Sequence, residues 1–331
     1  MTVPEPGAAS PSVTRAPLRS WRLGPTLIAL LTLLALITFN AAFTPNFLSI
    51  QTLNVNLTQV AAIVIVGVGM TLVIATGGID LSVGSLMAIS GALAPLLFTN
   101  PALSPPLGLL LAFTLPVLAA GVGGMFNGAL VTYFRIQPII ATLVLYIAGR
   151  GVAQVLTNGN LQSFRNPAFE SLAYGRLLGV PYQVILMLGV VAVVAWGVRA
   201  TVFGRYLEAV GDNEAAARLA GVPVDRVKGT VYLVSGLLAG VAGLIVVAIN
   251  RASDANQVGL NMELDAIAAV AVGGTALTGG RAHIVGTLLG ACIIQLIRYT
   301  LLARGVPDAV ALIVKAAVIV AAVYLLRPRR V

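Results

Sequence analysis

Residues 57–98 read LTQVAAIVIVGVGMTLVIATGGIDLSVGSLMAISGALAPLLF and contain two apolar runs joined by a short polar break. The first run is about 20 residues long, which as a helix crosses a hydrocarbon core of roughly 30 Å. The whole chain agrees, because 58% of its 331 residues are hydrophobic and 9% are charged, whereas about a quarter are charged in soluble domains. The sequence therefore predicts an all-α, polytopic membrane protein.

About ten apolar segments of this kind predict one transmembrane domain over 21–327. They lie at 23–43, 57–76, 82–98, 107–133, 138–157, 181–198, 229–249, 265–277, 283–303 and 306–326. The segments at 82–98 and 265–277 are short, so they could be broken or re-entrant helices. Residues 1–20 are rich in Pro, Ala and Ser and predict a disordered tail, while 328–331 form a basic end.

The basic residues predict the orientation of the chain in the membrane. Cytoplasmic loops carry an excess of Lys and Arg. The amino-terminal region, the loop 199–228 with its five basic residues, and the carboxy-terminal end are all basic. Ten alternating crossings place all three in the cytoplasm and leave 158–180 and 250–264 outside.

A short motif occurs twice. TGG at 76–78 precedes VGSL at 83–86, and with the same spacing TGG at 278–280 precedes VGTL at 285–288. Paired glycine-interrupted segments are typical of substrate pathways in transporters built from repeats, although in a glycine-rich apolar chain the match could also arise by chance. The helix breaks that the motif predicts fall at Gly77, Gly78, Gly279 and Gly280.

The sequence lacks the residues that several classes of chemistry require. Neither Lys228 nor Lys315 follows the glycine pattern of a phosphate-binding P-loop, so this chain is not expected to hydrolyse ATP by that route. One cysteine, Cys292, and one histidine, His283, cannot form a metal cluster or a nucleophile–base pair. The basic residues are not interleaved with aromatics, so nucleic acid is not an expected partner. An intramembrane enzyme is the weakest interpretation.

Two ionisable residues at membrane depth are candidates for function. Asp80, at the first glycine break, could cap the helix that begins near Leu81, could line a water path, or could do both. Lys315 lies near the centre of its apolar segment, where a charge costs about 2.5 to 3.5 kcal/mol, and is expected to face the protein interior. Arg150 lies nearer a segment end, where we expect it to extend toward the headgroup region.

The stretch 251–265 is the most polar outside the tails and the loop 199–228. Its side chains at Asp254, Asn256 and Glu263 provide the hydrogen-bond donors and acceptors that a hydroxylated solute needs. An ordinary solvated loop has a similar composition, so both interpretations stay open here.

Residues 211–223 predict a short cytoplasmic helix. Asp212 or Asn213 provides the N-cap, Glu214 an acidic first turn, and Gly221 the C′ position. A helix of about two turns is marginal alone and needs a packing partner. The partner could be the chain itself or a separate protein. The face expected to dock contains Ala216, Leu219 and Ala220.

These stretches resemble the membrane permease subunit of ribose-type ABC sugar importers, from about residue 57 onward. The resemblance rests on GVGMTLVI (67–74), GGIDLSVG (77–84), QP (137–138), ATL (141–143), AVGDN (209–213), AA (216–217) and AGV (220–222). Within that family, galactofuranose importer permeases are most similar in AGRGVAQ (148–154), DAN (254–256) and ELDAI (263–267).

The resemblance implies a bacterial inner-membrane importer for a monosaccharide, ribose-like or galactofuranose-like. Two permease copies or paralogues would form the path, a separate ATPase pair would bind ATP and Mg²⁺, and a periplasmic sugar-binding protein would deliver substrate. The permease chain itself would hold no cofactor and no metal. The helix after Asp212 matches the family's coupling helix, although Glu214 to Gly221 is one residue longer than the EAA-x3-G pattern of importers in general.

One alternative comes from another functional class. An autonomous secondary transporter would use Asp80 or Lys315 as its ion-coupling charge. Transport in the absence of any ATPase would favour it.

Overall fold

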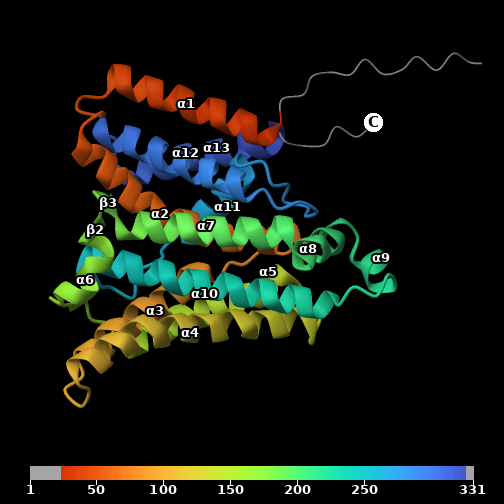
Figure 1. Ribbon diagram of the computed structural model, residues 1–331, viewed down its shortest axis with the longest axis horizontal. Coiled ribbons are helices and arrows are strands. Elements are labelled where there is room, and N and C mark those ends of the chain that lie inside the picture. Colours follow the sequence, from red (N-terminus) through yellow and green to blue (C-terminus); the bar gives the residue numbers. More distant parts are fainter. Residues whose placement is uncertain (1–23, 326–331) are drawn as a thin grey trace, which may run out of the picture.

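The computed structural model describes residues 24–325 (Figure 1). The predicted tail at 1–20, the basic end at 328–331 and the side chain of Lys315 lie outside the described part. The described chain forms thirteen helices and four very short strands. The helices are α1 (Pro25–Phe43), α2 (Ile50–Ala75), α3 (Val83–Phe98), α4 (Pro105–Thr132), α5 (Pro138–Leu156), α6 (Pro167–Tyr174), α7 (Tyr182–Ala200), α8 (Val202–Asp212), α9 (Glu214–Leu219), α10 (Val224–Asn250), α11 (Met262–Val272), α12 (Ile284–Ala303) and α13 (Asp308–Leu325). The strands are β1 (Gln162–Ser163), β2 (Arg176–Leu177), β3 (Val180–Pro181) and β4 (Ala252–Ser253).

Each of the ten predicted apolar segments overlaps a helix, and seven helices are long and apolar enough to cross a membrane. These seven are α1, α2, α4, α5, α7, α10 and α12. The predicted segment 265–277 is too long, because α11 ends at Val272 and Gly274 follows with a φ of +90°, a conformation that breaks a helix. With 16 residues in α3 and 11 in α11, a count of ten full crossings is not confirmed.

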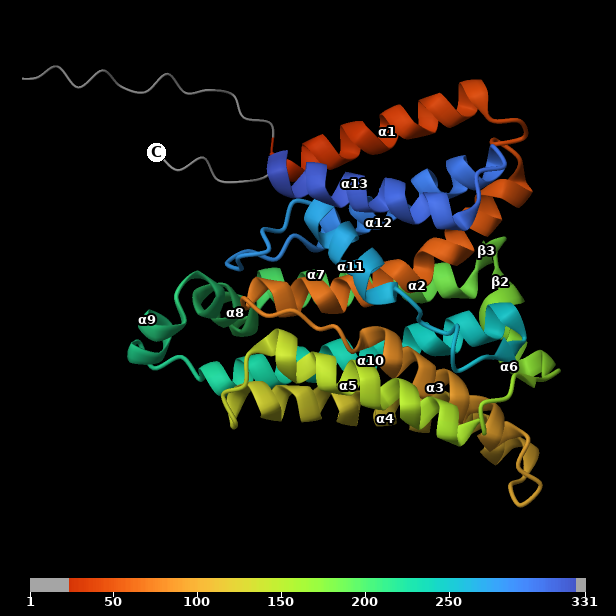
Figure 2. The same cartoon turned by 180° about the vertical axis from the view of Figure 1, so that it is seen from behind.

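Helix α2 forms the centre of the bundle. Every residue from Val60 to Ala75 is buried, as expected for a helix that is apolar on all sides. Its neighbours are α7, α10, α11 and α12 (Figures 1 and 2). A hydroxyl hydrogen bond of 2.6 Å between Thr71 and Thr287 joins it to α12. The first apolar run of the quoted sequence is therefore the core of the protein.

Small residues set the packing of α4 against α10. A methyl group on Gly124 would overlap the Tyr232 carbonyl oxygen and would lie 3.0 Å from the Cα of Gly236. One turn further along α4, a methyl group on Gly128 would lie 3.1 Å from the Cα of Gly229. Such small-residue contacts let two backbones approach closely within a membrane.

The two ends of the bundle differ. At one end, which we call the α6 end, β1 pairs antiparallel with β4 and β2 pairs antiparallel with β3, and α6 lies near β2 and β3 (Figure 1). Phe169 of α6 packs there against Phe98 and Phe113, with ring centroids 5.1 and 5.3 Å apart. The opposite end, which we call the α9 end, holds α8 and α9, and α1 begins and α13 ends there (Figures 1 and 2).

Candidate functional site

The first glycine break separates α2 from α3 within the bundle. Helix α2 ends at Ala75, and Gly77 follows with a φ of +77°, which side chains with a Cβ rarely adopt. Gly78 lies beside the hydroxyl of Tyr232, where a methyl group would approach to 2.7 Å. Gly77 therefore provides the turn, and Gly78 lies where there is no room for a side chain.

Asp80 lies at this break and is wholly buried. Its Oδ1 accepts hydrogen bonds from the Ser82 backbone amide at 3.0 Å and the Ser82 hydroxyl at 2.7 Å. Its Oδ2 accepts one from Ser235 of α10 at 2.8 Å, and Asn127 of α4 donates to the Ser82 hydroxyl at 2.8 Å. The carboxylate thus joins the start of α3 to α10, and α4 joins the network through Ser82.

The structure corrects the capping interpretation of Asp80. The N-cap of α3 is Ser82, because the chain makes one more turn after Asp80 before the helix begins at Val83. The carboxylate still satisfies one free amide, that of Ser82. Its other contacts run across the bundle, so it connects helices in addition to ordering its own loop.

The second glycine break, between α11 and α12, packs directly on the first. The Gly280 amide donates to the Ala75 carbonyl oxygen at 3.0 Å. A methyl group on Gly279 would lie 3.0 Å from the Gly77 nitrogen. The two copies of the TGG motif are therefore in contact, and Gly279 and Gly280 have φ values of +93° and +101°.

A third glycine completes this contact, and it belongs to α8. A methyl group on Gly211 would overlap the Ala75 carbonyl oxygen, and one on Gly280 would lie 2.5 Å from Oδ1 of Asp212. We call the set Ala75, Gly77, Gly211, Asp212 and Gly280 the glycine junction. It joins the end of α2, the loop before α12 and the last turn of α8 by backbone contacts and by the Asp212 side chain, which lies against Gly280.

The predicted solute-contact residues lie toward the α6 end. Oδ1 of Asp254 accepts from the Asn256 amide at 2.8 Å, and Oδ1 of Asn256 accepts from Gln154 at 2.7 Å. Glu263 is buried, and one of its carboxylate oxygens lies against Gly84. Arg150 does not extend to the headgroup region but donates to the carbonyl oxygens of Ala255 and Val258 at 2.7 and 2.6 Å.

A cavity of about 640 Å³ lies beside this loop, between α2, α10, α11, α12 and α13. Sequence reasoning missed its polar lining, which consists of Gln59, Asn250, Gln257, Asn261, Asp265, Gln295 and Arg298. Two amides inside otherwise apolar helices, Gln59 and Gln295, were the available signal. Gln295 Nε2 donates a hydrogen bond of 2.7 Å to Gln59 Oε1. This contact could not be predicted from the sequence, because the two residues lie far apart in it.

The short helix predicted after residue 211 forms, although it is only six residues long. Asn213 is the N-cap, and its side chain accepts from the Ala216 amide at 3.0 Å. Asp212 is instead the last residue of α8, and Gly221 follows α9 with a φ of +80°. Of the two predicted caps, Asn213 is the one that the structure uses.

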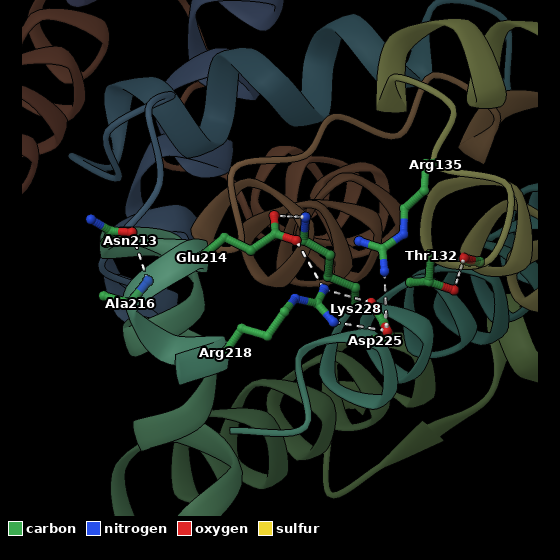
Figure 3. Close-up of polar contacts among 9 residues, drawn as sticks. Thr132, Arg135, Asn213, Glu214, Ala216, Arg218, Asp225 and Lys228 are labelled. Atoms are coloured by element: carbon green, nitrogen blue, oxygen red, sulfur yellow. Dashed lines mark hydrogen bonds and ion pairs between the residues drawn. The ribbon is translucent and has the colours of Figure 1, made fainter. Parts of the chain in front are cut away.

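Ion pairs hold α9 on the start of α10 (Figure 3). Glu214 pairs with Lys228, and Arg218 lies 2.9 Å from Asp225, which Arg135 also approaches to 3.7 Å. Burial raises the pKa of Glu214, but the hydrogen bonds and charges of Lys228 and Arg218 outweigh it and hold that pKa below its ordinary value. The carboxylate of Glu214 is therefore charged at neutral pH.

The predicted docking face of α9 points away from the chain. Ala217, on the opposite side, is buried against the protein, whereas Leu219 is 91% exposed. Ala216 and Ala220 are exposed as well. The chain therefore anchors one side of α9 and leaves an apolar side uncovered by any described residue.

Comparisons with known proteins identify the family of the chain. The model of the family described as branched-chain amino acid transport system / permease component matches residues 53–323. The chain belongs to this permease family. It is 44% identical over 304 residues to the ribose import permease protein RbsC of Escherichia coli K12, covering 90% of this chain and 91% of the relative.

Two other relatives of this permease carry related names. The galactofuranose transporter permease protein YtfT of Escherichia coli K12 is 43% identical over 263 residues, covering 80% of this chain and 76% of the relative. The L-arabinose ABC transporter permease protein AraH of Azospirillum brasilense is 32% identical over 333 residues, covering 99% and 96%. No solved structure matches the chain.

Family membership makes the chain a transport subunit and not an enzyme. The resemblance to sugar importer permeases is confirmed. Among the described residues of this permease, no group of three or more His, Cys, Asp or Glu side chains could hold a metal ion. The candidate site of this permease consists of two glycine breaks, one buried carboxylate and a short charged helix.

Proposed function

We propose that this permease moves a monosaccharide, ribose-like or galactofuranose-like, across the bacterial inner membrane by coupling to a separate ATPase. The relatives' names supply the substrate class and the ABC mechanism. A periplasmic binding protein delivers the sugar, and a second permease copy or paralogue completes the path. The loop 199–228 and both termini lie in the cytoplasm, so the α9 end faces the ATPase. The short helices α3 and α11 count as crossings, which gives ten.

The observation that carries the proposal is the exposed side of α9. A six-residue helix has little stability of its own, yet its ion pairs and the buried Ala217 fix it on α10. A rigid, apolar and uncovered side is what a docking contact requires. We assign Asn213 and Glu214 to holding the helix, and Ala216, Leu219 and Ala220 to contacting the ATPase, with Gly221 ending the helix.

The glycine junction connects that contact to the path. Coupling between two sites needs an element whose position both sites influence. Asp212 and Gly211 immediately precede α9, and Gly211 packs on the last carbonyl group of α2. A shift of α9 therefore moves the backbone at Gly77, next to the loop that holds Asp80. No side chain separates Gly211 from the Ala75 carbonyl oxygen.

The alternative of an autonomous secondary transporter receives no support from the relatives, one of which is named an ABC transporter permease. A direct test is uptake of labelled ribose and galactose into right-side-out membrane vesicles that contain the permease and the proteins that co-purify with it, with ATP enclosed in the lumen. Uptake should require ATP and should continue in the presence of an ionophore that collapses ion gradients. ATP-independent uptake that the ionophore abolishes would overturn the proposal.

Cysteine labelling can test the proposed orientation of the chain in the membrane. In a chain with Cys292 replaced by alanine, a cysteine at position 213 should resist an impermeant maleimide in intact cells and react after the membrane is opened. A cysteine at exposed position 257 should react in both cases. Labelling of position 213 from outside would reject the proposed topology.

A further inference from the structure

The polar cavity lies toward the α6 end of the bundle. Helix α10 starts next to α9 and reaches the cavity at its last residue, Asn250. In the proposed orientation, the sugar-binding protein delivers substrate to this side. The cavity measures about 640 Å³, within the roughly 300 to 1,000 Å³ typical of small-molecule sites.

One side chain in this cavity is incompletely satisfied. Gln295 is 2% exposed, and its Nε2 donates to Oε1 of Gln59 at 2.7 Å and to Oδ1 of Asn56 at 3.4 Å. Its Oε1 accepts no hydrogen bond from any described residue. Buried acceptors are nearly always paired, and this oxygen is a buried, unpaired acceptor on a residue that lines the cavity.

The rest of the lining suits a solute with several hydroxyl groups. Each amide offers both a donor and an acceptor, and each sugar hydroxyl needs both. Asn250 and Gln257 are exposed at the cavity. Ala62, Ile63 and Leu312 add an apolar wall, against which the C–H face of a sugar ring packs.

We propose that this cavity is a sugar-holding site of the permease itself, with Gln295 and Gln59 as its central hydrogen-bonding residues. The inference rests on the proposed function, because it takes a monosaccharide as the ligand. Binding there is weak, since a site on a transport path must also release its substrate. The permease then recognises the hydroxyl groups of the sugar itself, after the binding protein has already selected it.

Protection of an engineered cysteine can test this site. In the full-length chain with Cys292→Ala, Gln257→Cys places a thiol in the cavity lining. Maleimide labelling in membrane vesicles should be slowed by D-ribose or D-galactose at millimolar concentrations. An equal concentration of betaine, which has no hydroxyl groups, should leave the rate unchanged. Adding Gln295→Leu should weaken the protection by about tenfold in sugar concentration, the loss of about one hydrogen bond.

Gln51 provides the matched control, because it lies on α2 but outside the cavity lining. Gln51→Leu should leave the protection intact. If Gln295→Leu fails to reach the membrane, Gln59→Leu gives the same readout, because Gln59 is exposed. Absent protection, or equal protection in Gln295→Leu or Gln59→Leu, overturns the inference. ATP-driven uptake in the same vesicles would still support the proposed function, so the two failures can be told apart.

Discussion

Asp80 and Glu214 have similar positions relative to neighbouring glycines and helices, but their side chains have opposite surroundings. Each carboxylate follows closely on glycine residues and lies beside the start of a helix. Asp80 is wholly buried and accepts only from uncharged groups, namely those of Ser82 and Ser235. Glu214 is 41% exposed at its side chain and pairs with the cations of Lys228 and Arg218.

The difference shows which element is held more firmly. A buried, hydrogen-bonded carboxylate has no water to replace a lost partner, so the break at Asp80 is held in one arrangement. Ion pairs at a surface contribute about 0 to 1 kcal/mol each, because water screens them. The contacts that hold α9 are therefore individually weaker than those that hold the break at Asp80, and in the proposed mechanism the glycine junction lies between the two.

The largest effect is expected where the carboxylate is buried. Asp80→Ala leaves three donors without an acceptor, at about 1 to 3 kcal/mol for each unpaired group. We expect a clear fall in the thermal unfolding temperature of the purified permease and loss of uptake. Asp80→Asn keeps an acceptor for Ser82 and should lose less stability. Unchanged stability in the alanine variant would show that the network contributes nothing.

An intermediate effect is expected at the glycine junction. Gly211→Ala places a methyl group against the Ala75 carbonyl oxygen, and overpacking of this kind costs about 1 to 3 kcal/mol. The ATPase should still co-purify, while ATP hydrolysis no longer drives uptake. Gly229→Ala is the matched control, since a methyl group there meets no atom within 4 Å. Equal uptake in the two variants would remove the junction from the coupling route.

A smaller effect is expected from the ion pairs of α9. The folded-state pKa of Glu214 is depressed, so its contribution to stability is present above the pKa of the unfolded chain. It is lost as pH falls through the folded-state pKa, which lies below the ordinary value of a glutamate side chain. Hydrogen exchange at residues 214–219, corrected for intrinsic rates, should therefore speed up in acid. Glu214→Gln should exchange faster already at neutral pH and respond less to acid.

The smallest effect on stability belongs to the docking side. Leu219→Asp adds a charge to a side chain that is 91% exposed, so the unfolding temperature should not change. The same charge in an apolar interface is costly, and ATPase co-purification and uptake should both be lost. Leu178→Asp, at a 98% exposed leucine at the α6 end, should retain the ATPase. Full ATP-dependent uptake by Leu219→Asp would exclude α9 as the coupling element.

The local features were accessible from the sequence. Asn213 and Gly221 predicted both ends of α9, because caps depend on residues within one turn of the helix. The break at Gly77 was also predictable from the sequence, since few other residues adopt its backbone conformation. The N-cap at Ser82 was missed by two residues, because the turn that precedes α3 carries no unique pattern.

Contacts between distant segments were not accessible in the same way. The hydrogen bond from Gly280 to Ala75 and the one from Gln295 to Gln59 join residues that lie more than 200 positions apart. The apolar runs show that these helices lie in a membrane, but a helix that is apolar on all sides does not indicate which neighbours surround it. The sequence by itself determined the membrane class, the helical segments and the shape of α9. Only the tertiary structure brought Gly211 onto the end of α2 and two amides into one cavity, because those contacts depend on how all the helices pack together.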